Sequence, residues 1–321
     1  MIRFLANRLI AALPVLFIVS LLTFVLIYFV PGDVSAELAG PGASAADIAR
    51  IRSVYGLDSP FHERLLGWYA ALAQGDLGQS VLLRRSVTEA ILERLPVTLS
   101  LTALALFLAI AVGVATGILA AMRVNTWVDQ ATMTVALAGL SLPDFCLGLV
   151  MIYLFAVQLG WLPTGGIRTI GGAPPGGAAL DALRHLVLPS IALGAGYAAM
   201  FARTLRAGMV EAWHADHVRA AHARGLRRRA IVWRAVARPA LVPLLALLGQ
   251  HVGTLVGGSV VVETVFAVPG MGRLAFEAVS GRDALLLAGI LLCATGVVLV
   301  ANLLVDLALA RLDPRIGQSD G

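Results

Sequence analysis

Ionisable side chains are spread along this chain, but only a few of them have a type and a position that could support chemistry. Three histidines, His214, His217 and His222, could bind a metal ion, but their spacings of three and five residues do not stack them on one helical face. Cys146 and Cys293 lie far apart inside apolar runs, with no second ligand type at metal spacing. We therefore expect no metal site and no catalytic pair, and interpret the histidines as ordinary interfacial residues and the cysteines as packing side chains.

Three further ionisable residues lie within or beside apolar stretches. They are Asp144, His251 and Asp306. An ion-coupled secondary transporter needs ionisable groups well inside its spans, so this class of protein is the alternative to consider. Because the chain offers so few, the sequence favours another mechanism.

The composition narrows the class of protein further. Hydrophobic residues make up 59% of the chain, charged residues only 13%, and the mean hydropathy is +0.87, which together predict an integral membrane protein. All 24 basic residues are arginines, so the chain has no lysine for a phosphate-binding loop or a Schiff base. We expect a non-catalytic chain without a cofactor, and any ATP hydrolysis must reside on a partner.

Apolar stretches of about 20 residues predict six transmembrane helices. The first is expected in the N-terminal region 1–30 as an uncleaved anchor. The others are expected at 96–122, 131–159, 186–201, 240–262 and 284–310.

Charge predicts how these spans are oriented. Nine arginines lie between Arg203 and Arg238, and loops of this kind stay in the cytoplasm. Four crossings precede this loop, so both termini are expected in the cytoplasm and the 31–95 segment outside. The concentration of arginines beside membrane spans also accounts for the high pI of about 9.9 without a nucleic-acid partner.

The extracytoplasmic segment contains two predicted helices. Ser44 and Asp47 form a capping box for a helix that ends near Val54, and Ser59-Pro60 predicts the start of another that ends near Ala73. The segment could cap the outer ends of the spans or contact a delivered solute or its carrier.

Proline and glycine interrupt several of the spans. Pro143 lies in the third span, and Gly249, Gly253 and Gly257 recur every four residues in the fifth. Such small residues let helices approach closely in lipid, so a continuous packing stripe is expected. The alternative is that these faces slide or hinge around a translocation path.

The arginine-rich loop predicts a helix over 210–224 that stops at Gly225. Glycine suits the left-handed position after a helix, and alanines leave the helix slim. Asp216 and Arg219 can pair on one face. Composition alone leaves two interpretations open, attraction to anionic lipid and insertion into a cleft of another protein.

Sequence motifs in and around this loop carry a family resemblance. The segment from Asp216 to Leu226, followed by the run from Arg238 to Pro243, resembles the cytoplasmic signature of ABC-importer permeases of the dipeptide, oligopeptide and nickel class. Arginine stands where wider families have glutamate, as is usual in the peptide class. Further matches lie in order along nearly the whole chain, among them Pro31-Gly32-Asp33, Glu263 to Phe266, Pro269-Gly270 and Asp313-Pro-Arg315.

The resemblance implies an all-α permease in the bacterial inner membrane, with a cytoplasmic coupling helix between the fourth and fifth spans. It implies a second, homologous but non-identical permease, two ATPase subunits and an extracytoplasmic solute-binding protein as partners. The residues expected to contact an ATPase are Asp216, Arg219, Ala220, Ala223, Gly225 and Leu226. The candidates for gating or packing are Pro143, Gly253, Gly257, Glu263, Pro269 and Gly270.

The solute remains open at this point. Di- and oligopeptides are the first expectation, and nickel chelates, glutathione-like molecules and sugars are the alternatives. Asp144 and His251 depart from the family pattern, so their roles in the permeation path stay undetermined.

Overall fold

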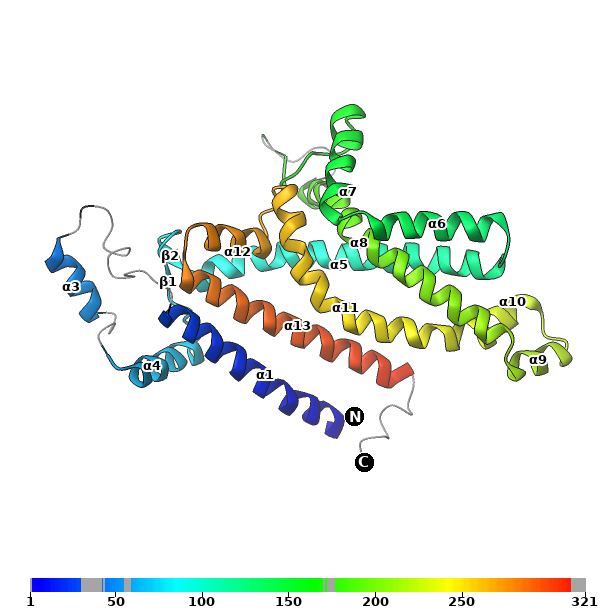
Figure 1. The fold of residues 1–321 in the computed structure, drawn as a ribbon, viewed down its shortest axis with the longest axis horizontal. Coiled ribbons are helices and arrows are strands. Elements are labelled where there is room, and N and C mark those ends of the chain that lie inside the picture. The colour runs from blue at the N-terminus through cyan, green and yellow to red at the C-terminus, as the bar shows by residue number, and fades with distance from the viewer. Residues whose placement is uncertain are drawn as a thin grey trace. The chain divides into compact units, whose positions relative to one another are not determined.

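The computed structural model describes residues 2–29, 42, 44–54, 59–169, 171 and 177–312, and it is built almost wholly of helices (Figure 1). The expected motifs at Pro31-Gly32-Asp33 and Asp313-Pro-Arg315, and the parts of the extracytoplasmic segment at 31–41 and 55–58, lie outside the described residues. The chain divides into two compact units. One comprises Met1–Leu5, Val97–Arg273 and Val298–Gly321, and the other Ala6–Pro96 and Leu274–Val297.

Helices α1, α3 and α4 and a short hairpin fall largely in the second unit. Their bounds are Ile2–Phe29, Ala45–Val54 and Phe61–Ala73 for the helices, and Gln79–Ser80 (β1) and Arg85–Ser86 (β2) for the antiparallel strands. Helix α4 lies against α1, since the rings of Phe24 and Trp68 are 5.5 Å apart and the hydroxyl groups of Ser20 and Tyr69 are 2.9 Å apart.

The capping box of α3 has the expected reciprocal bonds. The Asp47 amide donates to Ser44 Oγ at 3.2 Å, and the Ser44 amide donates to Asp47 Oδ2 at 3.1 Å. The hydroxyl and amide hydrogen bonds from Ser44 hold the pKa of Asp47 below its ordinary value. Helix α4 begins at Phe61, one residue later than the Ser59-Pro60 signal predicts.

An aspartate fixes the hairpin of the second unit. Asp283 is buried, and its Oδ2 accepts hydrogen bonds from Ser80 Oγ at 2.6 Å and from the Leu82 amide at 3.0 Å. Its Oδ1 accepts from the Leu286 amide at 2.9 Å, which caps the start of α13.

The first unit holds most of α5, the helices from α6 to α11 with the arginine-rich loop, and the end of α13, whereas most of α12 and the start of α13 belong to the second unit. Their bounds are α5 Val87–Met122, α6 Trp127–Ser141, α7 Asp144–Met151, η1 Ile152–Gln158, α8 Gly177–Trp213, α9 Asp216–Ala223, α10 Arg228–Ile231, η2 Val232–Val236, α11 Ala237–Val265, α12 Met271–Ser280 and α13 Ala284–Leu312. Figure 1 shows α6 running beside α8, with α9 and α10 at the C-terminal end of α8.

The third expected span, 131–159, is not one straight helix. Helices α6 and α7, with η1 continuing α7, form a pair bent by 104° at Leu142-Pro143. Proline disfavours a helical conformation in the preceding residue, and Leu142 is accordingly extended, with a ψ of 128°. Pro143 then serves as the residue before the first turn of α7, where its missing amide proton leaves no bond unmade.

Other helices run past the limits expected from their apolar stretches. Helix α5 passes through Pro96, α8 through Pro189 and α11 through Pro243. Proline within a membrane helix is tolerated when neighbouring helices satisfy the freed backbone groups. Helix α8 also extends from the expected 186–201 to Gly177–Trp213, so it enters the arginine-rich loop.

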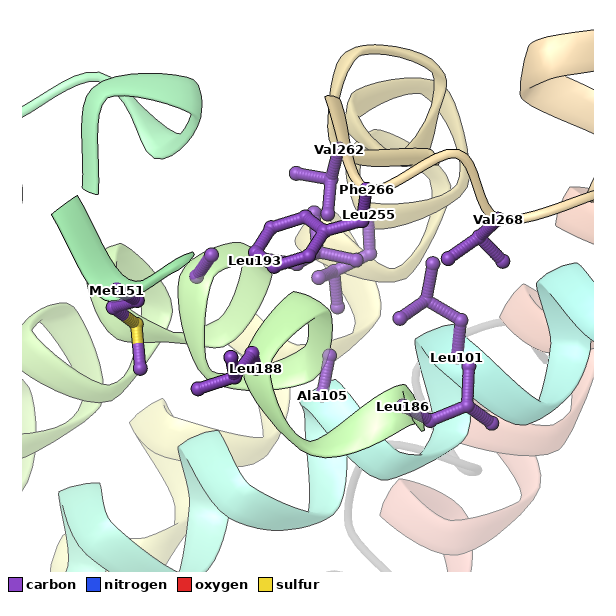
Figure 2. Packing of buried hydrophobic residues seen from close by; sticks show 11 residues of the cluster. Leu101, Ala105, Met151, Leu186, Leu188, Leu193, Leu255, Val262, Phe266 and Val268 are labelled. Atoms are coloured by element: carbon purple, nitrogen blue, oxygen red, sulfur yellow. The ribbon is translucent and has the colours of Figure 1, made fainter. Parts of the chain in front are cut away.

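The main core of the first unit lies where α5, α7, α8 and α11 meet. Figure 2 shows Phe266 beside Leu193, with Leu255 and Val262 contributed by α11 and Met151 by α7. Close backbone approach supports this packing, because a Cβ on Gly194 would lie 2.7 Å from the Ala105 carbonyl oxygen.

The described residues contain four helices long and apolar enough to cross a membrane, and a fifth if the bent pair counts as one span. In α1 the apolar stretch that can be described, Ile10–Val25, is shorter. The expected number of six spans therefore stays a prediction.

Candidate functional site

Helix α9 ends in a complete glycine-based C-cap. Gly225 has a φ of +72°, its amide donates to the His222 carbonyl at 2.9 Å, and the Leu226 amide donates to the Ala221 carbonyl at 3.3 Å. These two bonds define the Schellman motif, in which a left-handed residue reverses the chain. No atom lies within 4 Å of a Cβ built on Gly225, so backbone conformation alone requires this glycine.

The six residues expected to contact an ATPase lie together around this turn, and all six are exposed: Asp216, Arg219, Ala220, Ala223, Gly225 and Leu226. We call this set the coupling surface. Its charged pair, Asp216 Oδ1 and Arg219 Nη1, is 3.3 Å apart and open to solvent, so it adds little stability. The largest apolar member, Leu226, is 45% exposed.

The opposite face of α9 is buried. Val218 and Ala221 are 1% and 2% exposed and pack in a cluster with residues of α8, α10, η2 and α11. The helix expected over 210–224 is interrupted to allow this contact. Ala215 is extended, with a ψ of 150°, and the resulting turn after α8 folds α9 back onto that cluster.

Side chains not expected from the sequence strengthen this attachment. His217 Nε2 lies 2.9 Å from the Ala235 carbonyl oxygen of η2. The Trp213 ring lies 6.1 Å from the ring of His222 and 5.9 Å from the Arg228 guanidinium carbon. Helix α9 is therefore fixed to the C-terminal end of α8 and to the segment that leads into α11.

An ion pair between a half-buried arginine and a buried aspartate joins α8 to the start of α6. Arg206 donates from Nε to Asp129 Oδ1 at 2.5 Å and from Nη2 to Oδ2 at 2.6 Å, and the Asn125 amide donates to Oδ2 at 2.9 Å. Asp129 is 3% exposed, so a fork of this geometry fixes the orientation of two helices. The two residues are 77 positions apart, which explains why no sequence spacing indicated them.

Among the gating and packing candidates, Glu263 has the most developed surroundings. Its side chain is 0% exposed; Thr98 Oγ1 donates to Oε1 at 2.6 Å and the Arg273 amide donates to Oε2 at 2.9 Å. Thr98 Oγ1 in turn accepts from the Met271 amide at 2.7 Å. We call these four groups the Glu263 clamp, which joins α5, the end of α11 and the start of α12.

Gly270 and Pro269 belong to the turn that closes over this clamp. A Cβ on Gly270 would collide with the Glu263 carboxylate, so only glycine fits there. The Val268 amide donates to the Glu263 carbonyl at 2.8 Å, and the Gly166 amide donates to the Phe266 carbonyl at 2.8 Å. These hydrogen bonds hold the turn to the end of α11 and to the segment at Gly166.

The expected glycine stripe of α11 is only partly a packing surface. A Cβ on Gly249 would lie 2.9 Å from Val305, and one on Gly253 would lie 3.0 Å from Val298, so both face α13. Gly257 has no atom within 4 Å of such a Cβ and is exposed. Two of the three glycines therefore let α11 and α13 approach, and the third lies on an open face.

Comparisons with known proteins agree with this architecture. Residues 113–318 match the family described as binding-protein-dependent transport system inner membrane component, and residues 1–102 match the N-terminal part of such membrane components. The chain is 39% identical to the glutathione transport system permease protein GsiC of Escherichia coli K12 over 317 residues, which cover 98% of this chain and 99% of that protein. GsiC of Shigella boydii serotype 4 is 38% identical with the same coverage.

Two solved structures share the fold. A chain of the MetNI methionine ABC transporter in an inward-facing conformation gives a TM-score of 0.57 at 20% identity, covering 70% of this chain and 96% of that chain. A chain of an amino acid ABC transporter crystallised with histidines gives a TM-score of 0.50 at 19% identity, covering 71% and 94%.

Proposed function

The chain belongs to the binding-protein-dependent transport system inner membrane components, and on that premise we propose that it is the permease subunit of an ATP-driven importer of peptides. The family supplies the class of protein and its need for an ATPase and a binding protein. The chain itself would do no hydrolysis; its role would be to turn closure of two ATPase subunits into movement of membrane helices.

The observation that supports coupling best is the two-sided construction of α9. The residues on its outer face are mostly small and are exposed, while Val218 and Ala221 on the inner face are buried against the helices that lead into the membrane. A partner that binds the outer face would therefore move α8 and α11 together, because the packed interior transmits displacement.

The coupling surface also suits a cleft better than a membrane. Ala220 and Ala223 present little bulk, and the Schellman turn at Gly225 makes the end of α9 compact. Exposed arginines such as Arg219 and Arg224 could also attract anionic lipid, so the small size of Ala220, Ala223 and Gly225 is what favours a cleft. We infer that the coupling surface inserts into an ATPase.

The remaining assignments follow from this role. Both termini and α9 would lie on the cytoplasmic side of the bacterial inner membrane, and the turn over the Glu263 clamp would lie outside. A second, non-identical permease would complete the translocation path. Peptides are the proposed solute because the similar permeases are named for glutathione, a tripeptide, and an extracytoplasmic binding protein would deliver them.

The test compares two glycines of similar φ, +72° at Gly225 and +78° at Gly75. Gly225→Val and Gly75→Val both place a β-branched residue at positive φ, and neither Cβ meets an atom within 4 Å, so the local strain is matched. Each variant is assembled with its partner permease, ATPases and binding protein in proteoliposomes. The uptake of a panel of labelled di- and tripeptides, glutathione included, and the rate of ATP hydrolysis are then both measured.

We expect Gly225→Val to abolish uptake and the stimulation of ATP hydrolysis by the loaded binding protein, while Gly75→Val keeps both. Membrane insertion should be equal. Unchanged uptake by Gly225→Val would contradict the coupling role, and a wild type that takes up no peptide of the panel would contradict the proposed solute.

A further inference from the structure

The exposed residues of α11 form a stripe unlike that of α5. From Pro243 to Thr264 they follow a helical repeat of three and four residues, which places them on one side of the helix. They are Pro243, Ala246, Gln250, Thr254, Gly257, Val261 and Thr264. The exposed residues of α5 between 103 and 119 are all apolar: Ala103, Phe107, Ala111, Val112, Ala115 and Leu119.

Gln250 is the most informative member of the α11 stripe. It lies near the middle of the helix, about 20 Å from either end at 1.5 Å per residue. Its side chain is exposed, and within the described residues its amide has no hydrogen-bonding partner. An unpaired amide in hydrocarbon costs about 4–8 kcal/mol, so this position does not face lipid.

Neighbouring polar groups extend the same side of the helix. Tyr197 of α8 donates to Thr254 Oγ1 at 3.2 Å, and its ring lies 5.7 Å from the ring of His251. Thr254 Oγ1 donates to the His251 carbonyl at 2.8 Å and lies 3.4 Å from His251 Nδ1. Gly257, one turn further along, leaves open space beside this cluster.

We propose that Gln250, His251 and Thr254 of α11, with Tyr197 of α8, line the translocation path and form a mid-membrane station that hydrogen-bonds the amide groups of a passing peptide. Polar groups at mid-span face water-filled cavities or the interior of a bundle, which agrees with this placement. This inference rests on the proposed function for the identity of the solute.

The chemistry of the station suits amides. The Gln250 amide can both donate and accept hydrogen bonds, as a peptide group does. The Tyr197 and Thr254 hydroxyl oxygens can still accept beside the bonds that they already donate, and the His251 ring adds a further donor or acceptor. Uncharged groups such as those of Gln250, Tyr197 and Thr254 bind weakly enough to release a solute, which a conducting path requires. Methyl, hydroxyl and amide side chains of the solute would be tolerated equally.

Thiol labelling tests the placement without depending on transport. In a chain with Cys146→Ser and Cys293→Ser, we would introduce Gln250→Cys or Thr254→Cys on α11 and Phe107→Cys or Ala115→Cys on α5. A membrane-impermeant, water-soluble thiol reagent is applied to the assembled transporter in vesicles during ATP turnover. We expect labelling at 250 and 254 at least tenfold faster than at 107 and 115.

Equal, slow labelling at all four positions would overturn the inference, because the stripe would then face lipid or pack against the second permease. The result stands apart from the proposed solute, since water reaches the path whichever solute is carried.

Transport kinetics test contact with the solute. Thr254→Val is compared with Thr116→Val, an equivalent change at a threonine of α5 whose hydroxyl bonds the Val112 carbonyl at 2.6 Å. With the peptide of the panel that is taken up fastest, we expect the ratio of the maximal uptake rate to KM to fall about fivefold for Thr254→Val. Loss of one ordinary hydrogen bond has an effect of this size. Thr116→Val should match the wild type. Labelling at 254 with unchanged uptake by Thr254→Val and Gln250→Leu would overturn solute contact.

Discussion

The coupling surface and the Glu263 clamp belong to the same unit, yet they are built in opposite ways. The coupling surface consists of small or solvated residues on one exposed turn, whereas the clamp holds a fully buried carboxylate between segments 165 residues apart. Exposed residues are free to change without unfolding the chain, and buried hydrogen-bonded ones are not. Substitutions in the coupling surface should therefore impair transport, whereas substitutions in the Glu263 clamp should lower the stability of the fold.

The strongest test of this contrast removes the buried carboxylate. Glu263→Ala leaves the Thr98 hydroxyl and the Arg273 amide without their acceptor, in a site where the Glu263 side chain is 0% exposed. We expect the free energy of unfolding to fall by about 2–6 kcal/mol, because each of the two buried donors left without an acceptor costs about 1–3 kcal/mol. Thermal unfolding of the purified chain in detergent measures it, with exposed Glu89→Ala as the control. Equal melting of the two variants would mean that the clamp does not hold the fold.

A smaller loss should follow from crowding the clamp. Gly270→Ala places a methyl group against the Glu263 carboxylate, so the turn or the carboxylate must shift. Overpacking of this kind costs about 1–3 kcal/mol. Gly67→Ala is a glycine control, since no atom lies within 4 Å of its Cβ position and its backbone is not left-handed. Differential scanning calorimetry of both variants compares them, and a Gly270→Ala midpoint at or above that of the control would refute the tight approach.

The attachment of α9 should give an intermediate result in both assays. His217→Phe keeps a ring but loses the hydrogen bond to the Ala235 carbonyl, which is worth about 0.5–1.5 kcal/mol. We expect a small loss of stability and a larger loss of ATP-dependent uptake, because α9 would be less firmly fixed to η2. His214→Phe is the control, as the Nδ1 of His214 contacts only the Val210 carbonyl of its own helix. Full uptake by His217→Phe would show that this bond does not contribute to coupling.

The smallest effect is expected on the coupling surface itself. Asp216→Ala breaks an exposed ion pair with Arg219, so stability should change by less than about 0.5 kcal/mol. We expect ATP-dependent uptake to fall measurably while the melting temperature stays close to that of the wild type. A large drop in the melting temperature would erase the distinction between the two regions.

Local patterns predicted the turn at the end of α9 well, although the helix expected over 210–224 is interrupted at Ala215. The alanine-rich helix, the glycine at its end and the Asp216–Arg219 pair all involve residues within a few positions of one another, and the observed φ of Gly225 and the capping box at Ser44 agree with the expectation. The family resemblance was confirmed by the match over residues 113–318.

Long-range polar contacts were beyond sequence reasoning. Glu263 was singled out by its motif, but its partner Thr98 is far away in the chain, and Asp129 with Arg206 gave no local signal. Prolines were an uneven guide to the helices. The interruption expected at Pro143 agrees with the bend between α6 and α7, whereas Pro96, Pro189 and Pro243 lie inside continuous helices, because neighbouring helices decide whether a freed carbonyl is satisfied.

The central claim, that the exposed face of α9 contacts an ATPase, can be tested by photo-crosslinking. A photoreactive residue replaces Ala220 in the assembled transporter, and Trp161, which is 67% exposed after η1 on the side proposed to be outside, serves as the control position. We expect a product of the permease with an ATPase subunit from position 220 and none from position 161. A product from position 220 that contains lipid or the second permease, with no ATPase, would contradict it.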